Sequence, residues 1–171
     1  MSSGKRIVEI PIEKKIERIL AGRNMTVTTA ESCTGGLIAA TLVNADGISN
    51  VFKEGYITYS DEAKHKLLGV KEETLKEYGA VSRETAQQMA EGAARAAGAD
   101  AAIAVTGIAG PGGGTPEKPV GLVYIGCTFL GKTIVKRCFF SGDRNSIRLN
   151  TMREALQILY CRILGERSQE E

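Results

Sequence analysis

The chain has 171 residues, of which 43% are hydrophobic and 25% are charged, and its formal net charge is +2. This composition predicts one globular domain over residues 1–171, and so small a charge argues against a nucleic-acid-binding protein. The sequence has no run of 18 apolar residues and no apolar signal core at its start, so we expect no membrane span and a cytoplasmic location.

The first sixty residues alternate between helical and extended patterns. Isoleucines and a leucine at helical spacing follow Pro11, and β-branched residues at 25–30 are typical of a strand. In chain order we expect a helix from Pro11 to Gly22, a strand at 25–30, a helix at 35–44, a turn or short helix at 47–53, and a strand at 55–60.

The remainder continues this alternation and ends in a hairpin. We expect helices at 61–69, 71–79 and 82–98, a buried strand at 101–107, a glycine-rich loop at 108–119, a strand hairpin at 120–140, and a last amphipathic helix within 141–167. Strands that alternate with helices predict an α/β domain, with parallel strands early and antiparallel strands late. The polar loops 30–36, 59–64 and 106–118 are then expected to meet at the carboxyl ends of the strands.

The first of these loops, TAESCTGG, contains several side chains that can react or form hydrogen bonds. It joins an extended run to a helical run, so its backbone N–H groups can bind an anion or an oxyanion. Ser32 or Cys33 would be the nucleophile there. In the alternative interpretation Ser32 or Thr34 caps the following helix, and from this stretch alone the cap is favoured.

A nucleophilic serine needs a base, and the second loop offers Lys64. A lysine acts as a base only when its amine is neutral, which burial or cationic neighbours promote. The neighbouring His65 and Lys66 are expected to bias Lys64 toward the neutral form; in the alternative interpretation Lys64 is a solvated helix lysine, and from the local sequence alone this alternative is favoured. His65 is the only histidine, and no nucleophile elbow of the form GxSxG supports a serine triad with it.

Other motifs suggest binding rather than catalysis. The glycines of the third loop allow a close approach to an anion, although neither GxxxxGK[ST] nor GxGxxG can be written across it. In SGDR, Asp143 can cap the last helix, and Arg144 is either a phosphate ligand or a surface charge. The four cysteines lie far apart without a CxxC pair, so we expect no metal site and reduced, packed thiols.

Five segments in this order resemble the carboxy-terminal domain of the CinA (competence-damage-inducible) proteins, a family known as nicotinamide-nucleotide amidohydrolases. They are TAESCTGG, GYITYSDEAK, the LGV and YGAVS pieces, TGIAGPGGGTPEKPVG and SGDR. The resemblance covers about residues 8–165, and because longer members carry another domain before this one, it suggests the stand-alone form.

The resemblance implies a three-layer α/β/α fold with a mixed sheet, a homo-oligomer, and hydrolysis of the carboxamide of nicotinamide mononucleotide without a cofactor. It implies a serine–lysine pair, Ser32 and Lys64, with Tyr59 and Thr106 as supporting hydroxyls; the family often has serine in place of Thr106. For substrate binding we expect Glu31, Cys33, Thr34, Gly35, Gly107, Gly110, Gly112, Gly113 and Arg144. Glu31 either contacts the nucleotide or only organises its turn, and the second role is favoured.

Three other functions stay open from the sequence. The pocket could serve a non-catalytic nucleotide-binding or competence-associated scaffold, which would bind a ligand without releasing ammonia. Cys33 could be the nucleophile in place of Ser32. The domain could also be purely structural, in which case neither Ser32 nor Lys64 would matter beyond stability.

Overall fold

The computed structural model describes residues 9–165, and within them the chain forms a five-stranded sheet and six α-helices. The elements are α1 (Ile12–Gly22), β1 (Val27–Glu31), α2 (Leu37–Leu42), a 3-10 turn (Ile48–Asn50), β2 (Phe52–Ile57), α3 (Asp61–Leu68), α4 (Glu72–Tyr78), α5 (Arg83–Ala97), β3 (Ala101–Gly107), β4 (Leu122–Phe129), β5 (Lys132–Phe139) and α6 (Arg144–Leu164). The predicted order of elements is confirmed.

Some predicted boundaries were wrong for local physical reasons. Helix α2 begins only at Leu37 because Gly35 and Gly36 adopt left-handed backbone angles, with φ of +61° and +98°. Strand β2 begins at Phe52, earlier than its sequence pattern indicated, because Phe52 already pairs with Val27 of β1. The last helix ends at Leu164, and the remainder of its predicted range, beyond residue 165, lies outside the described residues.

The strands lie in the order β2-β1-β3-β4-β5. Strand β1 is parallel to both β2 and β3, whereas β4 is antiparallel to β3 and to β5. The predicted change from parallel to antiparallel pairing is therefore confirmed, and β3 is the strand where it occurs. Because β4 runs against β3, the glycine-rich segment between them leaves and re-enters the sheet at the same edge.

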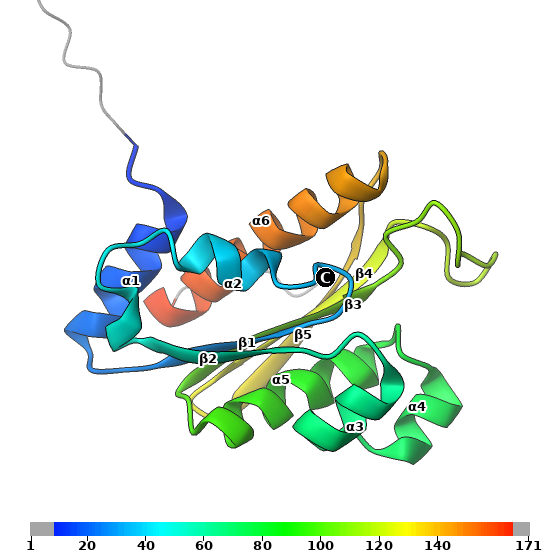
Figure 1. The fold of residues 1–171 in the computed structure, drawn as a ribbon, viewed down its shortest axis with the longest axis horizontal. Coiled ribbons are helices and arrows are strands. Elements are labelled where there is room, and N and C mark those ends of the chain that lie inside the picture. The colour runs from blue at the N-terminus through cyan, green and yellow to red at the C-terminus, as the bar shows by residue number, and fades with distance from the viewer. Residues whose placement is uncertain (1–8, 166–171) are drawn as a thin grey trace, which may run out of the picture.

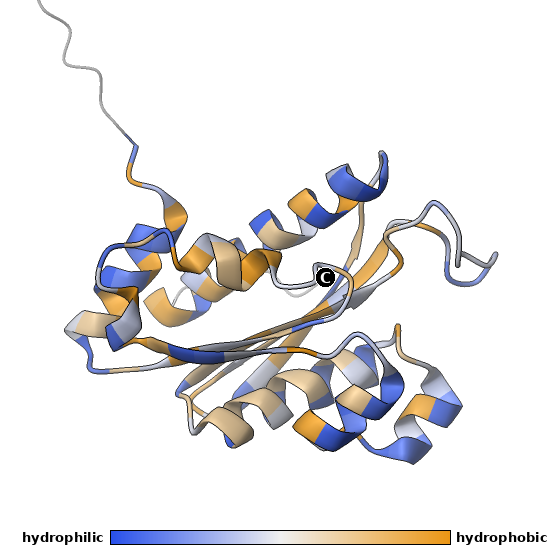
Figure 2. Cartoon of the chain, viewed as in Figure 1, coloured by the Kyte–Doolittle hydropathy of each residue, from blue (hydrophilic) through white to orange (hydrophobic). Residues whose placement is uncertain are grey.

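Helices cover both faces of the sheet, which gives the three-layer α/β/α arrangement predicted (Figure 1). Helices α1, α2 and α6 lie on one face, over a core of large aliphatic side chains such as Leu20, Ile38 and Leu156. Helices α3, α4 and α5 lie on the other. Part of β2 is hydrophilic, as are the N-terminal end of α6 and the outside of α4 (Figure 2).

The α5 face of the sheet is packed with small residues, which lets the helix approach the strands closely. Its core contains Ala90 and Ala93 of α5 and Ala102 and Ala104 of β3. A Cβ atom on Gly126 of β4 would lie 2.4 Å from a backbone oxygen of α5, so only glycine fits there.

Among residues 9–165, no helix has the length and apolar character needed to cross a membrane.

Candidate active site

A pocket of about 200 Å³ opens at the edge of the sheet where β1, β2 and β3 end. The predicted convergence of three loops is confirmed, since residues of all three line it. The lining residues are Ser32, Cys33, Tyr59, Asp61, Lys64, Ala80, Val81, Thr106, Gly107, Ala109 and Arg144.

Ser32 is the first residue after β1. Its N–H donates to the carbonyl oxygen of Val105 on β3 at 3.1 Å, which extends the strand pairing by one residue. The residue is only 9% exposed. The sheet therefore fixes the backbone of Ser32 at the pocket.

The turn after Ser32 is capped by a glutamate, not by the serine or threonine expected from the sequence. The Glu31 carboxylate accepts hydrogen bonds from the N–H groups of Gly36, Ile38 and Ala39, at 2.8–3.0 Å, and from the Thr34 hydroxyl at 2.6 Å. Glu31 and Thr34 are fully buried and outside the pocket lining. Their expected contact with substrate is not supported, whereas the favoured role of Glu31 in organising the turn fits these bonds.

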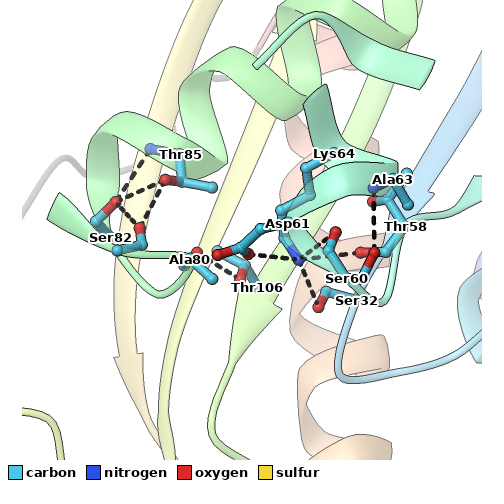
Figure 3. Close-up of polar contacts among 11 residues, drawn as sticks. Ser32, Thr58, Ser60, Asp61, Ala63, Lys64, Ala80, Ser82, Thr85 and Thr106 are labelled. Carbon is cyan, nitrogen blue, oxygen red and sulfur yellow. Dashed lines mark hydrogen bonds and ion pairs between the residues drawn. The ribbon is translucent and has the colours of Figure 1, made fainter. Parts of the chain in front are cut away.

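Lys64 comes to Ser32 from the first turn of α3. That helix starts where the Ser60 hydroxyl accepts a hydrogen bond from the N–H of Ala63 at 3.1 Å. The Lys64 side chain is 1% exposed, and its Nζ lies 3.4 Å from Ser32 Oγ (Figure 3). Nζ also donates to the carbonyl oxygens of Thr58 at 3.0 Å and Ser60 at 3.5 Å.

Burial lowers the pKa of the Lys64 ammonium below the usual lysine value, because a charge is poorly solvated there. The Asp61 carboxylate, with Oδ1 3.9 Å from Nζ, acts in the opposite direction and raises that pKa. The expected help from His65 and Lys66 was wrong. The His65 ring is bonded to the carbonyl oxygen of Val70 at 2.8 Å and lies 3.6 Å from Glu72, away from the amine.

Cys33 lies in the pocket beside Ser32 but is poorly suited to be a nucleophile. Burial raises the pKa of its thiol to about 11, and the charge of Glu31 adds to the increase. The thiol therefore stays protonated near neutral pH, and the thiolate is the reactive form. The cysteines of β4 and β5, Cys127 and Cys138, are buried as predicted, and Cys161 of α6 is partly exposed.

Thr106 is the last but one residue of β3 and lines the pocket. The residue is 1% exposed, and its hydroxyl donates to the carbonyl oxygen of Ala80 at 2.7 Å. The neighbouring carbonyl of Gly79 accepts bonds from the hydroxyls of Ser82 and Thr85. These hydroxyls fix the short segment before α5 that forms a wall of the pocket (Figure 3).

Tyr59 and the glycine-rich loop meet through Arg144. One guanidinium nitrogen of Arg144 donates to the Tyr59 hydroxyl at 2.7 Å, and the other donates to the carbonyl oxygen of Gly110 at 2.7 Å. Asp143 caps α6, since its Oδ1 accepts from the N–H of Ser146. Arg144 is thus more than a surface charge, because it joins two loops at the pocket.

The predicted binding glycines lie at different distances from the pocket. Gly107 lines it and Gly110 holds Arg144, whereas Gly35, Gly112 and Gly113 are exposed and are not part of the lining. Of these glycines, Gly107 and Gly110 are the ones that the structure places at the pocket or in contact with its lining.

Sequence reasoning missed several residues of the site. Asp61 lines the pocket, and its place one turn before Lys64 was the clue available. Ala80, Val81 and Ala109 carry no chemical group that would have marked them. Arg148 of α6, one helical turn after Arg144, binds the carbonyl oxygens of Cys33 and Thr34.

A serine and a buried lysine in contact at the carboxyl edge of a mixed α/β sheet define the class: an α/β domain with a candidate Ser–Lys site. Comparison with known proteins then gives the family. A model of the CinA C-terminal domain matches residues 9–163, and the chain belongs to this family.

Curated relatives are similar to this chain in sequence. A CinA-like protein of Kosmotoga olearia is 57% identical over 140 residues, which are 82% of this chain and 34% of the relative. A Clostridioides difficile relative, named for competence-damage induction, is 54% identical and matches 88% of this chain and 36% of its own length. The chain thus spans about a third of these curated relatives.

Solved structures of similar proteins share the fold. The competence damage-inducible protein A of Klebsiella pneumoniae has a TM-score of 0.87 and 40% identity, covering 91% of this chain and 97% of that one. The competence/damage inducible protein CihA of Agrobacterium tumefaciens has a TM-score of 0.82 and 46% identity, covering 90% and 97%.

Proposed function

We propose that this chain hydrolyses the carboxamide of nicotinamide mononucleotide to nicotinate mononucleotide and ammonia, with Ser32 as nucleophile and Lys64 as base. The observation that carries the proposal is the contact between the two: Lys64 Nζ is buried and 3.4 Å from Ser32 Oγ, inside a pocket. Such contacts are often long in a ligand-free site and tighten when substrate binds.

The hydrogen-bond partners of Lys64 suit a neutral amine. A neutral amine has two N–H donors and one lone pair, and the carbonyl oxygens of Thr58 and Ser60 accept from the two donors. The lone pair is then available for the Ser32 hydroxyl proton. Burial favours this form because it lowers the pKa of the lysine.

The chemistry follows in two halves. Lys64 takes the proton of Ser32 Oγ as the oxygen attacks the amide carbon, and the Lys64 ammonium then protonates the amide nitrogen, which leaves as ammonia when the C–N bond breaks. Water attacks the resulting nicotinoyl ester while Lys64 accepts its proton. The ester bond to Ser32 then breaks as Lys64 returns that proton to Ser32 Oγ, which releases the carboxylate. Backbone N–H groups of the turn after Ser32 stabilise the oxyanion in both halves.

The pocket suits the reacting end of this substrate. Its volume of about 200 Å³ is below the roughly 300–1,000 Å³ of whole-ligand pockets, so it accommodates the nicotinamide ring, and the ribose phosphate extends outward. At its mouth Arg144 offers donors for the phosphate. The half-exposed Asp61 carboxylate supplies a negative charge for the pyridinium cation.

The test is ammonia release from nicotinamide mononucleotide by the parent and by Ser32→Ala, Lys64→Met and Cys33→Ala. We expect turnover by the parent and by Cys33→Ala, and loss of at least about 10³-fold in the other two. Hydroxylamine added during turnover should yield the hydroxamate of the mononucleotide, because it intercepts the acyl-enzyme.

Other outcomes select the alternatives. Binding of the mononucleotide without ammonia release would indicate the scaffold function. Loss of activity in Cys33→Ala with retention in Ser32→Ala would identify the Cys33 thiol as the nucleophile. Full turnover by Lys64→Met would remove the lysine from the mechanism.

A further inference from the structure

Most backbone groups of the turn 32–36 are bonded, and one that is not lies two residues after the nucleophile. Ser32 N–H donates to Val105, Gly35 N–H donates to the carbonyl oxygen of Ser32 at 3.0 Å, and Gly36 N–H donates to Glu31. Within the described part of the chain, the N–H of Cys33 interacts with its own thiol, and the N–H of Thr34 donates to no acceptor. The Thr34 N–H is therefore the donor left for an oxyanion.

The carbonyl side of the same turn is held by Arg148. Its Nε donates to the carbonyl oxygen of Cys33 at 3.2 Å, and its Nη2 donates to that of Thr34 at 2.7 Å. The planar guanidinium fork can bond two successive carbonyls at once, which a lysine ammonium cannot do with the same geometry. Arg148 is half-buried and is not among the residues lining the pocket.

The peptide plane links this arginine to the free donor. The carbonyl of Cys33 and the N–H of Thr34 belong to one planar trans peptide and point in opposite directions. A guanidinium that holds the carbonyl therefore also fixes the direction of the N–H. The Glu31 carboxylate holds the N–H of Gly36 at the end of the turn and that of Ile38 in α2, so the turn is anchored on both sides of this peptide and the plane has little freedom to rotate.

We propose that Arg148 is a positioning residue for catalysis: through the Cys33 carbonyl it orients the Thr34 N–H as an oxyanion donor for the reaction at Ser32. The proposal rests on the proposed function for its substrate but not for its geometry. Removing one oxyanion donor typically lowers kcat by 10²–10³-fold. We expect Arg148→Met, which loosens a donor without deleting it, to lower kcat about 10–100-fold with KM nearly unchanged.

The first measurement does not depend on the natural substrate. A fluorophosphonate reacts with an activated serine and places its P=O oxygen at the oxyanion position, so the rate of Ser32 labelling, followed by intact mass, reports on the donors. Arg148→Met should label more slowly than the parent. Arg153→Met is the control, because Arg153 is on the same helix and its side chain bonds only Asn150 among the described residues. Ser32→Ala gives the background.

The second measurement uses the mononucleotide and its thioamide. Sulfur is a poorer acceptor than oxygen at such donors, so Arg148→Met should lose more activity on the amide than on the thioamide, which a general loss of structure would not produce. Arg148→Lys serves if Arg148→Met does not fold, and it should retain part of kcat.

The outcomes separate the two proposals. A parent that is labelled at Ser32 but releases no ammonia contradicts the amidase function alone, and the labelling rates still decide about Arg148. Equal labelling of Arg148→Met and Arg153→Met, equal losses on amide and thioamide, or no labelling of the parent at Ser32 would each overturn the role of Arg148.

Discussion

Two segments rich in small residues meet at the same edge of the sheet and are held very differently. The turn 32–36 is bonded on both sides, by the Glu31 carboxylate and by Arg148, and it is continuous with β1. The glycine-rich segment 108–121 is mostly exposed between its ends. Side-chain bonds reach it at Gly110, from Arg144, and at Lys118, whose Nζ donates to the carbonyl oxygen of Tyr78.

The difference between the bonded turn and the exposed segment illustrates two requirements of a functional site, rigidity and adaptability. A group that reacts must be held in one geometry, and most backbone groups of the turn after Ser32 have partners that restrict them. A segment that contacts the outer part of a ligand can adapt, and exposure together with few bonds permits that. The following experiments test whether rigidity is confined to the turn and its partners.

The largest effect is expected for Lys64→Met, which removes the base from the rigid part of the site. Activity should fall at least about 10³-fold. In the parent, kcat/KM should rise with pH as Lys64 loses its proton, with a midpoint below the usual lysine pKa because burial lowers it. The measurement is the pH profile of ammonia release.

The same variant separates catalysis from stability. Because the folded pKa of Lys64 lies below the unfolded one, the unfolded chain binds more protons between the two values, and the parent gains stability there as pH rises. Lys64→Met lacks this slope. Urea unfolding at pH 6, 8 and 10 should show that the free energy of unfolding of the parent rises with pH relative to that of the variant. The same pH dependence in both proteins would contradict a lowered pKa of Lys64.

Glu31→Gln should weaken the turn by about 3 kcal/mol. The amide would direct an N–H₂ group at backbone N–H donors and leave at least one of them buried without an acceptor. Chemical denaturation measures the change. Glu73→Gln, at an exposed position of α4, is the control and should stay within about 0.5 kcal/mol of the parent.

Thr106→Val tests the wall of the pocket. It removes the 2.7 Å bond to the Ala80 carbonyl, and we expect kcat/KM to fall about 10-fold, equivalent to the roughly 1–3 kcal/mol of an unsatisfied buried group. Thr106→Ser keeps the hydroxyl and should retain most activity. Equal losses in both variants would show that shape, not the hydrogen bond, matters.

The smallest effects are expected for two glycine variants, one in each segment, which compare the segments directly. Gly35→Ala places a Cβ at φ +61° in the turn and should cost about 1 kcal/mol. Gly112→Ala lies in the exposed loop, where a Cβ would meet nothing within 4 Å, and should change stability by less than about 0.5 kcal/mol. Thermal unfolding of both variants gives the comparison; similar losses would contradict it.

The sequence predicted most of the fold because hydrophobic period, caps and glycines are local features. It also predicted that the loops carrying Ser32 and Lys64 would meet, since both follow parallel strands, whereas the pairing of the two side chains was implied by the resemblance to the CinA family. It did not predict strand order or the start of β2 at Phe52, because both depend on pairing between distant residues. Nor did it predict the cap by Glu31 or the reach of Arg148, since a hydrogen bond between distant segments leaves no local pattern.

The reversal of direction between β3 and β4 has a consequence for how this family can diversify. It brings the two ends of the glycine-rich segment together: Ile108 N–H donates to Leu122 at 2.9 Å, and Gly121 N–H donates to Ile108 at 2.8 Å. Insertions or deletions between them leave the sheet intact, and doubling a loop's length costs only about 0.6 kcal/mol. The length and sequence of this exposed segment can thus change in evolution while the positions of Ser32 and Lys64 stay unchanged.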